Sequence, residues 1–170
     1  MATEFTDSME LGVARAKLRE KVWEGATCPL CRQTAKAYRR SIHAGIVVAA
    51  IRLYRATTPG EFGHLPTVEK PQRGGEGAKL RYWKLAVEEA ERREDGGRSG
   101  WWCLTPDGGR SGWWCLTPDG RAFVEGSHRV QRYAWVYDGR LLRREGELVS
   151  IADCLGDKFS YAELMNGGRS

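Results

Sequence analysis

The stretch of sequence that predicts the fold is residues 79–126, KLRYWKLAVEEAERREDGGRSGWWCLTPDGGRSGWWCLTPDGRAFVEG. Within it, residues 95–106 (DGGRSGWWCLTP) are repeated letter for letter as residues 107–118. Because the two copies differ by no substitution, we interpret them as a recent duplication and not as units of a folded repeat family.

Each copy consists of a glycine-rich turn and a short aromatic strand, in which alternate side chains face opposite sides. Only one copy can lead directly into residues 121–124, and chain continuity favours the second copy, at residues 113–117. Trp114 and Leu116 would then face the same side. We expect the first copy to add a further hairpin strand, because exposure of its two tryptophans is unfavourable.

The residues before the copies have the spacing of a helix. Leu80, Trp83 and Val87 recur at three- and four-residue steps, which predicts a helix from Ala78 to about Val87 with these side chains toward the core. Three basic side chains would point outward: Lys79, Arg81 and Lys84. A helix followed by two strands has the order of a recognition helix and a β-wing in a winged helix-turn-helix domain.

A longer helix is predicted from Ala35 to Arg55, where apolar residues recur at three- and four-residue steps. It is the expected central helix of the core. Basic residues lie along one side of its first half: Lys36, Arg39 and Arg40. A short edge strand is expected at residues 64–68, since Pro66 lacks the backbone donor that an inner strand needs.

An amphipathic helix is expected near the N-terminus. Leu11, Ala14, Leu18 and Val22 fall on one face of it, and Gly25 ends it.

Cys28 and Cys31, in the sequence CPLC, have the spacing of a zinc knuckle, in which two thiolates converge on one ion. A structural zinc site needs four ligands, and the chain holds no second Cys-x-x-Cys. His43 is the candidate third ligand, and His64 or Cys154 would supply the fourth. Two alternatives stay open: the pair binds no metal or binds it only with a partner chain, or it is a thiol–disulfide redox centre. A redox centre of this type needs a preceding strand, whereas here a helix precedes the pair.

The C-terminal third contains the sequence VQRYAWVYDGRLL at residues 130–142, which predicts a β-hairpin. Alternating aromatic and β-branched residues flank Asp138 and Gly139, the pair preferred in a type I′ turn. Two short helices are expected to follow, each with the spacing of a capping box at its start: Ser150 with Asp153, and Ser160 with Glu163.

Together these segments predict an α+β fold: a winged helix-turn-helix core with an N-terminal helix, a Cys-x-x-Cys knuckle, and a C-terminal β-hairpin plus short helices. We place the N-terminal helix and knuckle at residues 1–34. The winged-helix domain, with its duplicated wing segment, follows at residues 35–126, and the C-terminal part at residues 127–170 packs on it.

The chain of 170 residues carries a net charge of +5. The excess lies in residues 1–60, which hold 10 Lys/Arg against 5 Asp/Glu, and such a basic segment is compatible with phosphate binding.

No apolar run approaches the roughly 20 residues that cross a bilayer, so no membrane partner is expected. The acidic N-terminus lacks a secretory pattern, which makes a cytoplasmic location the expectation. Five cysteines in such a location do not predict a disulfide framework.

Five of these segments resemble a family of uncharacterised winged-helix proteins of bacteriophages and mobile elements: CPLC, KLRYWKL, GWWCLTPDGRAFVEG, RYAWVYDGRLL and SIADCLGDKFSYAELM. The resemblance covers most of residues 28–165. It implies a helix-turn-helix fold with a wing, and DNA binding without a known target. The second twelve-residue copy departs from the family's pattern and changes the expected geometry of the wing.

We therefore predict a non-catalytic protein that binds double-stranded DNA, a regulator of the phage or mobile-element type. The recognition helix would enter the major groove, and arginines of the wing would contact phosphates. The predicted DNA contacts are Lys79, Arg81, Lys84, Arg92, Arg93, Arg98, Arg110, Lys36, Arg39 and Arg40.

The alternative function is a winged-helix module that docks another protein through its aromatic wing, since tryptophan is favoured at the centres of such contacts. The wing tryptophans are Trp101, Trp102, Trp113 and Trp114. The sequence contains no paired-carboxylate motif and no nucleophile elbow, so it does not predict an enzyme; the redox centre at Cys28 and Cys31 is the remaining enzyme alternative. The sequence does not fix the oligomeric state.

Overall fold

Helix α2 (Ala44–Ala56) lies at the centre of the fold and is buried on nearly every side. The computed structural model describes residues 9–29, 31–69, 75–89 and 112–167 of the chain. Seven of the thirteen α2 residues are buried, as the apolar middle of the predicted helix requires.

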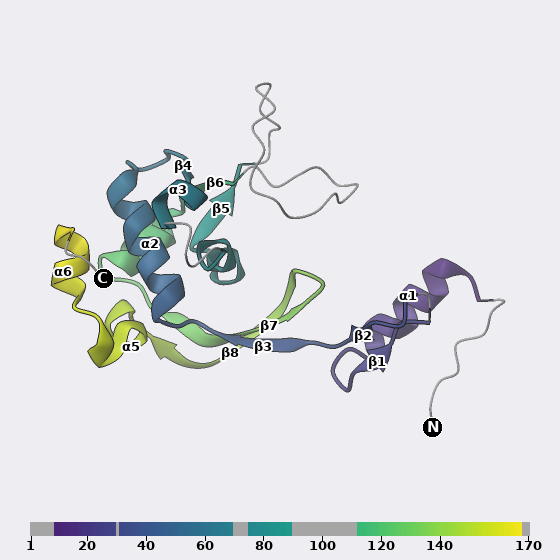
Figure 1. Cartoon of the computed structure of the whole chain (residues 1–170). Helices are drawn as coiled ribbons and strands as arrows, with labels where there is room; N and C mark the ends of the chain where they lie inside the picture. Colours follow the sequence, from purple (N-terminus) through teal and green to yellow (C-terminus); the bar gives the residue numbers. More distant parts are fainter. Residues whose placement is uncertain (1–8, 30, 70–74, 90–111, 168–170) are drawn as a thin grey trace, which may run out of the picture.

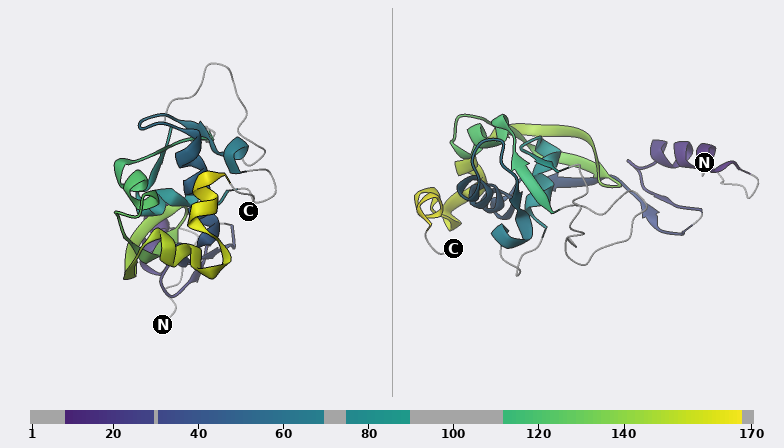
Figure 2. Two further views of the ribbon diagram at one scale, coloured as in Figure 1. Left: turned by 90° about the vertical axis from the view of Figure 1, so that its left-hand side faces the viewer. Right: turned by 90° about the horizontal axis from the view of Figure 1, so that it is seen from above.

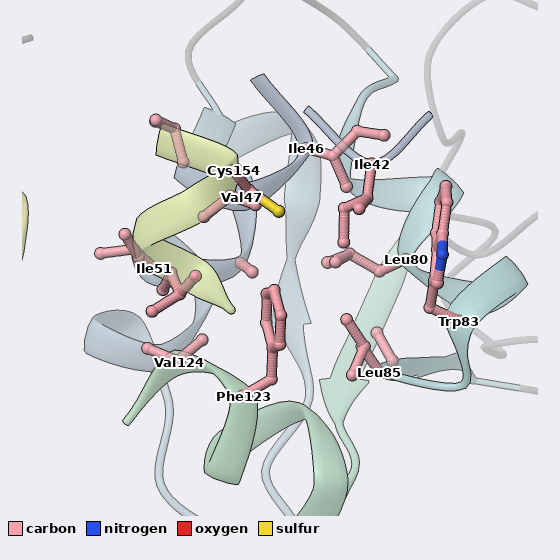
Figure 3. Packing of buried hydrophobic residues seen from close by; sticks show 14 of the residues in the cluster. Ile42, Ile46, Val47, Ile51, Leu80, Trp83, Leu85, Phe123, Val124 and Cys154 are labelled. Atoms are coloured by element: carbon pink, nitrogen blue, oxygen red, sulfur yellow. The ribbon is translucent and has the colours of Figure 1, made fainter. Parts of the chain in front are cut away.

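The main hydrophobic core surrounds α2. In Figure 3, Ile46, Val47 and Ile51 of α2 point into a cluster that also contains Leu80 and Phe123. Full burial of a large apolar side chain contributes about 1.5–3 kcal/mol, so this cluster is the main source of stability.

Residues 35–41 do not continue this helix toward the N-terminus, as we predicted, but form strand. Strand β3 (Tyr38–Ser41) pairs antiparallel with β7 (Val130–Tyr137). The four-residue step from Tyr38 to Ile42 fits a helix, but the same two residues also lie on one side of a strand. Pairing with β7 decides between the two, because tertiary context overrides a local pattern of this kind. The predicted helix is therefore correct only from Ala44 onward.

A three-stranded sheet packs against α2. Its strands are β4 (Gly63–His64), β5 (Ala86–Glu88) and β6 (Trp113–Leu116), in the order β4-β6-β5 with antiparallel pairs. The second copy of the repeat supplies β6, as predicted. Trp114 and Leu116 are both buried in the core.

Between β4 and β5 the chain forms helix α3 (Leu65–Glu69) and the 3₁₀ helix η2 (Gly77–Trp83). The predicted edge strand at 64–68 is wrong beyond its first residue. Pro66 lies in the first turn of α3, where a missing backbone N–H costs nothing because that group has no partner within the helix.

The predicted α-helix from Ala78 to Val87 is also wrong. The buried residues of η2 are Gly77, Leu80 and Trp83, which recur every three residues, the period of a 3₁₀ helix. Lys84 adopts a left-handed conformation at φ 59° and ends the helix. Val87, which a longer helix would bury, lies in β5 and is exposed.

The C-terminal third forms the structure that its sequence predicts. Strands β7 and β8 (Arg140–Val149) make a hairpin, and Asp138 and Gly139 at its turn have φ values of 49° and 69°, as a type I′ turn requires. Three short helices follow: α5 (Ile151–Leu155), η3 (Gly156–Lys158) and α6 (Tyr161–Asn166). Ser150 and Asp153 form the expected capping box, and the Ser160 side chain accepts a hydrogen bond from the Glu163 N–H.

The second sheet has the order β3-β7-β8, so the N-terminal and C-terminal parts of the chain share it. Val130 and Ala134 of β7 belong to the same core as α2. The C-terminal third is therefore part of the central core and not an appended layer.

The N-terminal segment forms a small unit at one end of the molecule, away from α5 and α6 (Figures 1 and 2). It consists of α1 (Leu11–Glu20) and the hairpin of β1 (Ala26–Thr27) and β2 (Thr34–Ala35). Four buried residues form its own hydrophobic cluster: Leu18, Val22, Ala35 and Ala37. Ala35 and Ala37, which follow the boundary that we predicted at residue 34, also belong to this cluster.

A substitution at Gly120 in α4 (Pro118–Val124) tests how closely this helix approaches the segment between η2 and β5. A Cβ atom at Gly120 would lie 1.9 Å from the carbonyl oxygen of Leu85, which already accepts a hydrogen bond from the Thr117 N–H. We expect Gly120→Ala to lower the free energy of unfolding by about 3 kcal/mol or more, measured by urea denaturation. Gly12→Ala, where nothing lies within 4 Å, is the control and should cost nothing. Equal stability of the two variants would contradict this packing.

Deletion of residues 95–106 tests the assignment of the second copy to β6. The deletion shortens the connection from β5 to β6 and leaves both strands intact. Because halving a connection lowers its closure cost by about 0.6 kcal/mol, we expect the variant to fold and to be as stable as the full chain or slightly more stable. A lower midpoint in thermal denaturation would show that the first copy contributes to the folded structure.

Candidate nucleic-acid interface

The basic residues predicted on the recognition helix lie on and just after η2, and two of them are engaged within the chain. Lys79 Nζ lies 2.7 Å from Glu76 Oε1. Arg81 Nη2 donates to the hydroxyl of Tyr82 at 3.1 Å and to the carbonyl of Gly139, in the β7–β8 turn, at 3.4 Å. Arg81 is thus hydrogen-bonded to the C-terminal hairpin, and its guanidinium is less available to a ligand than a free side chain would be.

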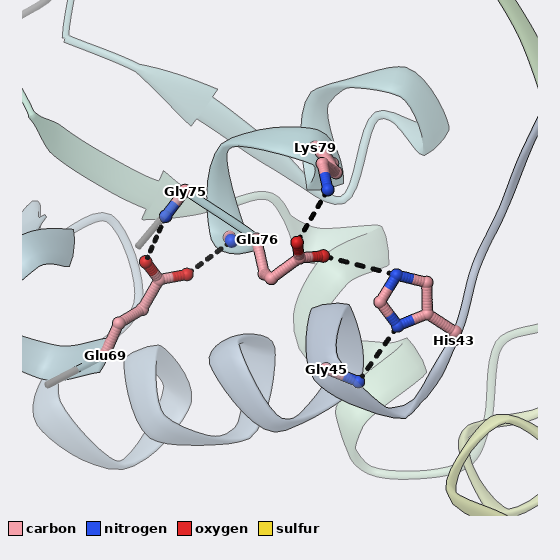
Figure 4. A network of polar contacts seen from close by, with 7 residues as sticks. His43, Gly45, Glu69, Gly75, Glu76 and Lys79 are labelled. Atoms are coloured by element: carbon pink, nitrogen blue, oxygen red, sulfur yellow. Dashed lines mark hydrogen bonds and ion pairs between the residues drawn. The ribbon is translucent and has the colours of Figure 1, made fainter. Parts of the chain in front are cut away.

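Glu76 also binds His43, the candidate third zinc ligand (Figure 4). His43 Nδ1 accepts the Gly45 N–H at 3.2 Å, and His43 Nε2 lies 3.2 Å from Glu76 Oε2. Because Nδ1 is an acceptor here, the proton of the ring lies on Nε2, which is in ion-pair contact with the Glu76 carboxylate. Both ring nitrogens are therefore used to join the start of α2 to the start of η2.

Glu69, at the end of α3, fixes η2 from the other side. Its carboxylate accepts the N–H of Gly77 and, at 3.2 Å, the N–H of Gly75 (Figure 4). Arg52 Nη1 of α2 donates to the Glu69 carbonyl at 2.7 Å. Burial raises the pKa of the Glu69 carboxyl above its usual value of 4.5, although the two backbone donors act in the opposite direction.

Lys84 is exposed at the end of η2 and borders an open cleft of about 620 Å³. The cleft lies between η2, β5 and the start of α4, with the lining residues Arg81, Lys84, Ala86, Val87, Glu88, Thr117, Pro118 and Asp119. Its charged groups are two cations and two carboxylates. A cleft of mixed charge suits a single phosphate contact at Lys84 better than a site for a polyanion.

Arg39 and Arg40 lie on the exposed strand β3. The guanidinium of Arg39 lies 4.6 Å from the ring centre of Tyr133, and that of Arg40 lies 5.7 Å from the ring centre of Tyr38. Neither arginine forms an ion pair within the described ranges of the chain. Lys36, between β2 and β3, is also exposed.

Cys28 and Cys31 lie at the tip of the β1–β2 hairpin, on the unit at the end of the molecule. Cys28 packs against the hydrophobic cluster of that unit, and Cys31 is exposed. The structure does not bring His43 to this pair: among the described residues, no three His, Cys, Asp or Glu side chains come together as a metal site would require. His64 and Cys154, the candidate fourth ligands, lie in β4 and α5.

The predicted wing contacts Arg92, Arg93, Arg98 and Arg110, and the tryptophans Trp101 and Trp102, lie outside the described residues. Of the second copy, Trp114 is buried in the core, and the Trp113 ring lies 5.3 Å from that of His64. Trp114 therefore does not belong to an exposed docking surface.

The sequence analysis missed the stacked group that holds the N-terminal unit on the sheet. The rings of Trp23 and Trp135 lie 5.4 Å apart, and the Arg143 guanidinium lies over both, at 4.6 Å and 5.8 Å. The alternation of Tyr133, Trp135 and Tyr137 on β7 was the available signal, because it predicts one aromatic face on this strand.

No protein-family model, curated protein or solved structure matches the chain. Among the described residues, no helix has the length and apolar character needed to span a membrane.

The raised pKa of Glu69 predicts a pH dependence of stability. A raised pKa in the folded state contributes stability that is complete below the unfolded value, near 4.5, and is lost as the pH rises through the folded value. Glu69→Gln does not titrate. Relative to this variant, the wild type should therefore gain free energy of unfolding as the pH falls from 7 toward about 5, measured by urea denaturation. A difference that is constant or reversed with pH would contradict the assignment.

Proposed function

We propose that this chain binds double-stranded DNA without catalysing a reaction, on a winged helix-turn-helix architecture, as a regulator of the phage or mobile-element type that its sequence resembles. The order of its elements supports the architecture: α2, β4, α3, η2, β5 and β6, with β6 between β4 and β5 in the sheet. A helix, a strand, two further helical segments and two wing strands follow one another in this way in winged-helix domains.

A fold does not determine a function, so the proposal rests on a site. The observation that carries it is the state of two arginines on the edge strand β3, whose side chains face opposite sides of the sheet. Arg39 and Arg40 are exposed, stacked on tyrosine rings, and without a carboxylate partner among the residues that the structure describes. A guanidinium stacked on a ring keeps its N–H edge available, and this edge matches the oxygens of a phosphate.

The position of β3 relates this pair to η2. After β3 ends at Ser41, the chain continues through Ile42 to His43, and the His43–Glu76 contact joins this segment to the start of η2. Lys84 lies exposed at the other end of η2. The arginines of β3 are thus connected to the start of η2 through residues 41–43, and Lys84 is exposed at its other end; a DNA backbone could contact both regions.

This proposal differs from the sequence-based prediction in the roles of two residues. Lys79 is bound by Glu76 and Arg81 by the β7–β8 turn, so we assign both to the support of η2. Among the residues that the structure describes, we propose Lys84, Arg39 and Arg40 as the main phosphate contacts. Since η2 has only two turns, we expect binding to depend more on the DNA backbone than on the base sequence.

Measurement of duplex affinity over a salt series tests the proposal. The wild type should bind with an affinity that falls steeply as salt rises. Arg39→Ala with Arg40→Ala should weaken binding and reduce the slope of log affinity against log salt by about 0.9 to 1.8, because each lost phosphate contact removes about 0.9 and the two side chains face opposite sides of β3. Lys84→Ala should reduce the same slope by about 0.9, and Lys79→Ala should reduce it by less.

The matched control is Arg129→Ala with Lys158→Ala, which removes the same charge at exposed positions that belong to neither β3 nor η2. It should change the slope less than the β3 variant. Equal effects of the two double variants would contradict the placement of the site. Absence of measurable duplex affinity at low salt would contradict DNA binding itself and favour the protein-docking alternative.

A further inference from the structure

The turn that carries Cys28 and Cys31 is closed by backbone hydrogen bonds. The Cys28 N–H donates to the Gln33 carbonyl at 2.8 Å, and the Arg32 N–H donates to the Cys28 carbonyl at 2.9 Å. Arg32 has a φ of 58°, in the left-handed region that a non-glycine residue adopts only when its surroundings require it. The Cys-x-x-Cys spacing is that of the ligand pairs in structural zinc sites, and here it lies at the tip of a hairpin.

A structural zinc site needs two more ligands than this turn supplies. Every other His and Cys that the structure describes lies outside the N-terminal unit or is used elsewhere. His43 is held by Glu76 and Gly45, and Cys115 is buried in β6. Burial raises the pKa of the Cys154 thiol to about 11, so it stays protonated at neutral pH. Neither cysteine of the turn is in a disulfide.

We propose that two copies of this chain bind one zinc ion together, with Cys28 and Cys31 of each copy as the four thiolate ligands. The hairpin lies at the end of the molecule farthest from α5 and α6 (Figures 1 and 2), where a second hairpin can approach it, and Cys31 is exposed there. Two identical turns related by a twofold axis supply four thiolates in a tetrahedral arrangement, with the same surface used on both chains.

The charge around the turn suits this site. Zinc with four thiolates carries two net negative charges. Residues 9–41, which form the N-terminal unit and β3, hold eight Lys/Arg and three Asp/Glu, so two such units would repel one another without an anionic centre. The zinc–thiolate group at the twofold axis offsets this repulsion, and dimerisation should therefore depend on the metal.

Zinc content and molar mass, measured together on the reduced full-length chain, test this proposal independently of DNA binding. We expect one zinc ion per two chains, and a dimer that a chelator converts to monomer and added zinc restores. Cobalt in place of zinc should give the intense visible absorption of a tetrahedral four-thiolate site. Cys28→Ser with Cys31→Ser should lose both the metal and the dimer, while the far-ultraviolet circular dichroism spectrum of the chain stays unchanged.

Cys154→Ala is the matched control and should keep the zinc and the dimer. One zinc ion per chain in a monomer would overturn the shared site, because the chain would then complete it alone. A chain that takes up no zinc, or a dimer that survives in the Cys28→Ser, Cys31→Ser variant, would overturn it as well.

Discussion

The burial of α2 on nearly every side is the constraint on which the rest of the structure depends. One helix with apolar residues around most of its circumference cannot be covered by a single layer. The β4-β6-β5 sheet and η2 cover part of it, and α4, α5 and α6 cover the remainder. The C-terminal third is therefore needed for the core, although its sequence lies outside the segment that predicts the fold.

This constraint also determines which cations can reach a ligand. Trp83 of η2 is buried, and its indole N–H donates to the Gln131 carbonyl of β7 at 2.7 Å. The hairpin that completes the core thus packs on η2 and binds Arg81. Arg81 is held by this hairpin and Lys79 by Glu76, whereas the arginines on the edge strand β3 stay exposed. In our proposal, the phosphate contacts therefore lie on β3 more than on the predicted helix.

Elements with their own local signals could be predicted from the sequence. The Asp138-Gly139 turn, the Ser150–Asp153 capping box and the part of the predicted helix from Ala44 onward all formed as expected, because short-range hydrogen bonds or an apolar run specify each of them. The two wrong helices had signals that fit two structures. The spacing of Tyr38 and Ile42 fits a helix or a strand, and that of Leu80 and Trp83 fits an α-helix or a 3₁₀ helix. In both cases contacts with β7, which is distant in the sequence, determine which structure forms. Arg39 and Arg40 were predicted as DNA contacts on a helix face. The contact of Arg40 with Tyr38 instead needs a strand at this position, and that of Arg39 with Tyr133 needs its pairing with β7, which the sequence does not reveal.

The polar contacts of η2 show how the site is coupled to the core. Glu69 holds its first turn through backbone N–H groups, and Glu76 joins it to His43 at the start of α2. A map of backbone amide chemical shifts, recorded with and without a DNA duplex, tests the central claim most directly. The account predicts changes at β3 and around Lys84, with α5 and α6 unaffected. Binding that changes α5 or α6 and leaves β3 unchanged would contradict it.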